Sequence, residues 1–155
     1  MNNPQICPAC GADWSDGKTC EDHFHQMLFW ENEYPELTYE VHNLLVASYY
    51  IQHPHLYSPQ GLANAITMLG EFLSGVTPKE MREKMRDGVN SVNRKFKITG
   101  TPESHGSYPE PIAWTMFPRD ITSQPVEEYM DNIRAWARSI YEALKNAGVT
   151  SASSS

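Results

Sequence analysis

Three cysteines and a histidine near the amino end constrain this chain more than any other feature of its sequence. Cys7 and Cys10 stand two residues apart on a Pro/Gly turn, and Cys20 and His23 follow at the same short spacing. Two thiols at this spacing can point at one tetrahedral ion while backbone N–H groups face the sulfurs. The pattern therefore predicts a zinc knuckle over residues 7–25 that fixes the amino-terminal arm.

The identity of the fourth ligand is open. Cys20 and His23 lie three residues apart at the start of a predicted helix, which favours His23. His42 or His53 is the alternative, because distance along the sequence does not exclude a ligand from another element. The predicted metal ligands are thus Cys7, Cys10, Cys20, His23, His53 and His42. The competing interpretation is three reduced cysteines without a metal, whereas a thioredoxin-like role is disfavoured because no βαβ pattern surrounds the cysteine pair.

Prolines, glycines and capping residues divide the chain into about five predicted helices. Pro35 ends the first helix, since the residue before a proline avoids the helical region. Ser58-Pro59 opens the third helix, and Thr77 and Glu80 form a capping box that opens the fourth, a charged surface helix with a narrow apolar stripe. The predicted ranges are 21–33, 38–52, 58–75, 77 onward with Met81, Met85 and Val89 on its stripe, and 125–146.

These elements predict an all-α, bundle-like fold in a single domain. The last helix is the clearest, because its apolar residues recur at i, i+3, i+4 and i+7. A short irregular or β segment is expected near 94–120, where 96–98 alternates like a strand and the apolar residues 112–117 fold back on the bundle. We expect residues 1–148 to form this domain, with a disordered tail over 149–155.

Composition narrows the classes of partner and compartment. The 155-residue chain has a formal net charge of −7 and no basic run, so it lacks the phosphate-neutralising face of a nucleic-acid-binding protein. Its start has no secretory signal, and its longest apolar stretch, 44–51, is too short to cross a bilayer. Three cysteines without a signal peptide fit a reducing cytosol, which predicts a cytoplasmic protein without a nucleic-acid or membrane partner.

A stripe of polar aromatic side chains follows one face of the second predicted helix. His42, Tyr49 and His53 fall within about 20° of one another around the helix axis. They form either the wall of a pocket or a row of metal ligands, although histidines on an apolar helix are more often hydrogen-bonded core groups. Glu31 and Glu33 are candidate acids or metal partners, but a solvated helix face is the favoured explanation for both.

Several of these motifs together resemble a bacterial domain family of unknown function. The similarity spans Cys7 to about Leu144 and rests on residues 7–12, Cys20, 41–46, 49–54 and 133–141. The resemblance implies that His42 and His53 belong with the three cysteines as signature positions. It implies no activity, and His23 is not part of the family pattern.

The sequence favours a binding or interaction module with a structural zinc ion. No phosphate-binding loop, His-Glu-x-x-His or Gly-x-Ser-x-Gly motif is present. The alternative is a metal-dependent, hydrolase-like enzyme with an open coordination position in a pocket near His42 and His53. The wide aromatic face of the last helix also predicts a possible homodimer through that helix.

Overall fold

The computed structural model describes residues 6–14, 17–80, 83 and 99–149. Its elements confirm the predicted all-α fold, and the described residues pair only in isolated β-bridges, such as Tyr57 with Thr99. The order of elements is α1 (Cys20–Glu33), α2 (Pro35–Gln52), the 3-10 turn η1 (Pro54–Leu56), α3 (Pro59–Leu73), α5 (Pro118–Thr122), the 3-10 turn η2 (Val126–Glu128) and α6 (Tyr129–Asn146). None of the described helices combines the length and the hydropathy needed to cross a membrane.

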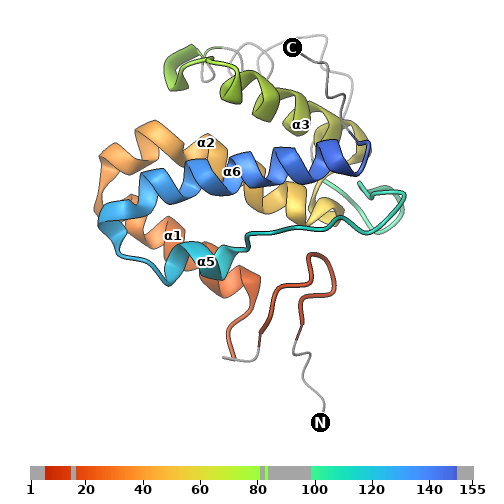
Figure 1. Ribbon diagram of the computed structural model, residues 1–155, viewed down its shortest axis with the longest axis horizontal. Helices are drawn as coiled ribbons and strands as arrows, with labels where there is room; N and C mark the ends of the chain where they lie inside the picture. Colours follow the sequence, from red (N-terminus) through yellow and green to blue (C-terminus); the bar gives the residue numbers. More distant parts are fainter. Residues whose placement is uncertain (1–5, 15–16, 81–82, 84–98, 150–155) are drawn as a thin grey trace.

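Helices α2 and α6 pack against each other at the centre of the fold (Figure 1). Helices α1 and α5 cover them on one side, and α3 lies on the opposite side. The apolar face of α6 is fully buried, as its predicted periodicity requires; it comprises Ile133, Trp136, Ala137, Ile140 and Leu144. Burial of large apolar side chains contributes about 1.5–3 kcal/mol each, so this face makes a large contribution to core stability.

Local capping chemistry explains where the helices begin and end. The Ser58 hydroxyl accepts a hydrogen bond from the Gly61 N–H at 2.9 Å at the start of α3, and Gly75 follows its end with a positive φ of 121°. Helix α2 begins at Pro35, three residues earlier than predicted. A proline is well suited to the first helical position, because its fixed φ is helical and its missing N–H would have no partner there.

The capping box at Thr77 is confirmed. The Thr77 N–H donates to Glu80 Oε1 at 2.9 Å, and the Glu80 N–H donates to Thr77 Oγ1 at 3.2 Å. The apolar stripe predicted for this helix and the strand-like residues 96–98 lie outside the described residues.

The segment after residue 99 contains a helix that the sequence analysis missed. Helix α5 spans five residues within and just beyond the segment expected to be irregular, and five residues are too few to show helical periodicity. Asp120 Oδ2 accepts a hydrogen bond from the Phe117 N–H at 2.9 Å and caps the helix. Ile121, a residue of this helix, is fully buried.

The apolar residues 112–117 fold back on the helices as predicted. The Gln52 amide Nε2 donates to the Met116 carbonyl at 2.7 Å, and the Tyr108 hydroxyl donates to the Ile51 carbonyl at 2.5 Å. The two bonds attach Met116 and the nearby Tyr108 to the end of α2. Val149, the first residue of the predicted tail, packs against the core, and residues 150–155 are outside the described part of the chain.

Candidate metal centre

The turn that carries Cys7 and Cys10 is held by its own backbone. The Cys7 N–H donates to the Ala12 carbonyl at 2.8 Å, and the Gly11 N–H donates to the Cys7 carbonyl at 2.9 Å. Gly11 has a φ of 84°, a left-handed conformation that favours glycine. The backbone N–H groups of Ala9 and Cys10 both face the Cys7 sulfur at 3.4 Å. Such donors stabilise a thiolate, as the Pro/Gly turn predicts.

Cys20 enters the site as the first residue of α1. Thr19 caps this helix, with its hydroxyl accepting from the Asp22 N–H at 3.1 Å. Cys20 therefore lies at the amino-terminal end of the helix, where the helix dipole is positive. The Trp14 indole Nε1 donates to the Cys20 sulfur at 3.4 Å. The sulfurs of Cys10 and Cys20 are 3.6 Å apart, and all three cysteines are free thiols.

His53 reaches the three cysteines from the end of α2. It is the C-cap residue of that helix, so its side chain leaves the helix axis where Pro54 stops the regular turns. Its Nδ1 lies 2.6 Å from the Tyr49 carbonyl oxygen, which makes Nδ1 the protonated nitrogen. The lone pair is then on Nε2, the tautomer a metal ligand needs. The Tyr49 ring stacks on His53 with centroids 4.4 Å apart.

The structure therefore brings four ligand atoms together, one from each of Cys7, Cys10, Cys20 and His53, which we call the Cys/His cluster. These atoms all lie within 4.8 Å of one another, and all four residues are buried. Zinc–sulfur bonds of about 2.3 Å in a tetrahedron place neighbouring sulfurs about 3.8 Å apart, close to the separation of Cys10 and Cys20. No other group of this kind occurs within the described residues.

A buried nitrogen shows that these residues fit a metal ion. His53 Nε2 is buried and has no hydrogen-bond partner of good geometry among the described residues. An orphaned buried nitrogen costs about 1–3 kcal/mol unless something binds it. Here it faces a set of thiols, and a divalent cation would satisfy both the nitrogen and the sulfurs.

The thiols and the imidazole perturb one another strongly. Hydrogen bonds with Cys10 and Cys20 lower the pKa of Cys7. Hydrogen bonds with Cys20 and Cys7, together with burial, raise the pKa of Cys10. Burial acts to lower the pKa of His53, but the nearby sulfurs of Cys20 and Cys7 outweigh burial and raise that pKa to about 9. A thiolate at Cys7 is thus placed in the interior beside His53, where a bound cation would neutralise it.

The other two candidate histidines lie elsewhere. His23 Nδ1 is 2.7 Å from the Thr122 hydroxyl of α5, and His42 Nδ1 is 2.7 Å from Glu31 Oε1. His42 and His53 are eleven residues apart on one helix, which separates them by about 16 Å. One ion cannot contact both of them. His23 lies on nearly the same face of α1 as Cys20, but its ring is bonded to Thr122 of α5 and is not one of the four clustered ligands.

A second polar cluster surrounds Glu31, for which the sequence analysis had favoured a solvated helix face. The structure buries this carboxylate, leaving 3% of it exposed. Its Oε2 accepts from the Tyr129 hydroxyl at 2.6 Å, and its Oε1 is bonded to His42. Burial and the neighbouring Glu31 charge raise the pKa of Tyr129, so its hydroxyl stays a donor. The cluster joins α1, α2 and α6.

The bond between His42 and Glu31 predicts a pH dependence of stability. The hydrogen bond that His42 donates to Glu31 raises the pKa of His42 above its ordinary value of 6.5, against the lowering effect of partial burial. A raised histidine pKa adds stability that is fully present below about pH 6.5 and declines as the pH rises through the folded-state pKa. Urea unfolding across this range should show the decline in the wild type. His42→Gln should flatten it, and an unchanged slope would contradict the pairing.

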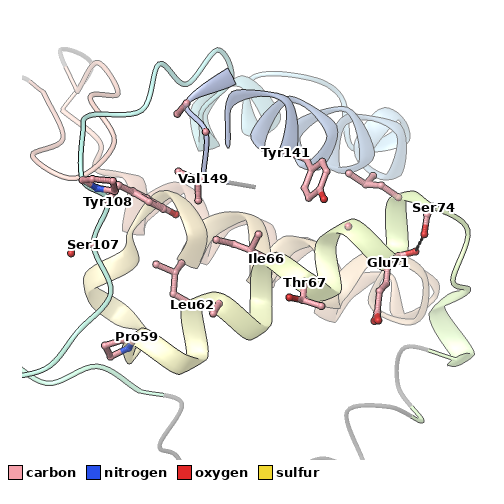
Figure 2. Close-up of a pocket in the computed structure, with 16 residues that line it drawn as sticks. Pro59, Leu62, Ile66, Thr67, Glu71, Ser74, Ser107, Tyr108, Tyr141 and Val149 are labelled. Atoms are coloured by element: carbon pink, nitrogen blue, oxygen red, sulfur yellow. Dashed lines mark hydrogen bonds between the residues drawn. The ribbon is translucent and has the colours of Figure 1, made fainter. Parts of the chain in front are cut away.

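The described residues line cavities that lie away from the Cys/His cluster. One of them, about 990 Å³, lies between α3 and the end of α6. Leu62, Ile66 and Tyr141 line it (Figure 2), and it shares no residue with the Cys/His cluster. A smaller cavity of about 470 Å³ adjoins His42 and Glu31. This smaller cavity lies beside His42 and is not lined by His53, so a pocket near both histidines stays a prediction.

The fold and site define the class of protein as an all-helical domain with a buried group of three cysteines and one histidine able to hold a metal ion. The chain belongs to DUF5946, a family of unknown function whose family model matches residues 5–145. No curated protein and no solved structure matches it. The family identification confirms the resemblance to a family of unknown function and assigns no activity.

Proposed function

We propose that this domain is a binding or interaction module in which the Cys/His cluster holds one structural zinc ion. The observation that supports this proposal is the closure of the site: four buried protein ligand atoms lie within 4.8 Å of one another. A structural zinc site uses four protein ligands, whereas a catalytic one keeps a position for water. The ligands join the amino-terminal turn, the start of α1 and the end of α2, so the metal would tie three distant segments together.

The same proposal covers the compartment and the partners. Three free thiols and a net charge of −7 support a reducing, cytoplasmic setting and disfavour nucleic acid as a partner. A homodimer through the last helix remains a prediction. The apolar face of α6 is buried inside the domain, so a dimer would have to use the remaining surface of that helix, and light scattering at two concentrations tests it.

Metal analysis and X-ray absorption on protein purified without chelator test the metal site directly. We expect one zinc per chain with three sulfur neighbours and one nitrogen neighbour. An oxygen neighbour in place of one of these would favour the alternative, a metal-dependent hydrolase. Fully ordered protein without any bound metal would contradict both.

Two matched variants identify the fourth ligand. His53→Gln should lower zinc affinity by about 10- to 100-fold or more, because it removes a ligand from a four-coordinate site. His23→Gln is the control: it removes a buried histidine that is bonded to Thr122 and should leave the zinc content unchanged. The reverse pattern would show that His23 is the ligand.

A further inference from the structure

A cleft between α1 and α2 has the size of a small-molecule site. It has a volume of about 470 Å³, within the range of about 300–1,000 Å³ typical of ligand pockets. We call it the α1–α2 cleft, and its polar and aromatic lining residues are Glu31, Asn32, Thr38, Tyr39, His42 and Asn43.

The Glu31 carboxylate in this lining is already hydrogen-bonded to other protein groups. Both oxygens of Glu31 are bonded, Oε2 to the Tyr129 hydroxyl and Oε1 to His42 Nδ1. The Glu31 carbonyl also accepts a hydrogen bond from the Thr38 hydroxyl at 2.9 Å. Glu31 is also buried, with 3% of its surface exposed. Its carboxylate is therefore poorly placed to bind a cation that enters the cleft.

The histidine in this lining is oriented by that acid. The His42 side chain is 40% exposed, and its Nδ1 is directed at the buried Glu31. The two nitrogens lie on different edges of the imidazole ring, so Nε2 is directed away from Glu31. Glu31 raises the pKa of His42, which favours the form that carries an N–H donor on Nε2 as well.

We propose that the α1–α2 cleft binds a small molecule through an oxyanion group, a carboxylate or a phosphate. His42 supplies a charge-assisted donor, and the side-chain amides of Asn32 and Asn43 supply neutral ones. The Tyr39 ring offers an apolar wall for the rest of the ligand. Because the bond to Glu31 holds the His42 ring in one orientation, less conformational entropy is lost when a ligand binds.

Nuclear magnetic resonance of the full chain, titrated with acetate and separately with inorganic phosphate at constant ionic strength, tests this proposal. We expect saturable shifts of the His42 ring signals with one or both anions, and a higher His42 pKa in the bound form. His42→Gln should weaken binding about tenfold or more, since a hydrogen bond to a charged group is lost. Asn43→Asp, which preserves shape but adds negative charge, should abolish it.

His25→Gln is the matched control, because His25 is exposed on α1 and is not part of the cleft lining. It should bind both anions as the wild type does. A preference for phosphate or for acetate would identify the ligand group. His42 signals that do not respond to either anion, or equal affinity in folded His42→Gln, would overturn the proposal and leave Glu31 and His42 as a structural link. The cleft shares no residue with the Cys/His cluster, so this result does not depend on the metal.

Discussion

Cys7→Ser is expected to lower the melting temperature by about 10 °C or more and to abolish stoichiometric zinc binding. The Cys7 sulfur accepts two backbone N–H contacts and is one of four ligands in the Cys/His cluster. A structural zinc site contributes on the order of 10 kcal/mol to folding, and a loss of several kcal/mol lowers the melting temperature by about 2–4 °C per kcal/mol in a chain of this size. Calorimetry together with metal analysis measures both effects.

A strong chelator provides the matching experiment on the unaltered protein. It should reduce the melting temperature of the wild type to near that of Cys7→Ser and have little further effect on the variant. His55→Ala is the control, because His55 is exposed and is not in the cluster, and it should be nearly silent. Equal and small effects from both substitutions would show that no structural metal is present.

Tyr129→Phe should destabilise the domain by about 3 kcal/mol, although it removes a single oxygen atom. Tyr129 is completely buried, and its hydroxyl donates to Glu31 Oε2 at 2.6 Å. Without this donor, one oxygen of a buried carboxylate has no partner from α6. Leaving a buried acceptor unsatisfied costs about 1–3 kcal/mol, and more for a charged group. Urea unfolding at neutral pH measures the loss.

Tyr34→Phe separates this effect from the general effect of removing a hydroxyl. Tyr34 is 44% exposed, so water replaces any partner it loses, and the change should be within about 0.5 kcal/mol. Adding Glu31→Gln to Tyr129→Phe should recover part of the loss, because the uncharged amide is cheaper to bury. If Tyr129→Phe were as mild as Tyr34→Phe, the bond between Tyr129 and Glu31 would carry little energy.

Most helix boundaries were predictable because they depend on neighbours in the sequence. Ser58 with Pro59, and Thr77 with Glu80, satisfy the first N–H groups of a helix whatever the rest of the fold does. The boundary that was predicted late, Pro35, uses the same chemistry, a proline at the first helical position. Helix α5 was missed because five residues carry no periodicity, and its stability depends on burying Ile121.

The candidate sites divide in the same way. The cysteine turn was predictable, because Cys7 and Cys10 are positioned by bonds within six residues. The sequence did not decide which of three histidines joins these cysteines, because that depends on how α1 and α2 pack against each other. The local sequence does not predict that Glu31 is buried, because its hydrogen-bond partner Tyr129 is 98 residues away in the sequence.

The sequence by itself determined the helical periodicity, the caps and the thiol-bearing turn, because each of these depends on interactions between residues a few positions apart. Tertiary structure alone decided that His53 joins the three cysteines and that Glu31 is enclosed by His42 and Tyr129. The physical reason is that the direction of a side chain is fixed locally, whereas the side chain it meets depends on how whole helices pack.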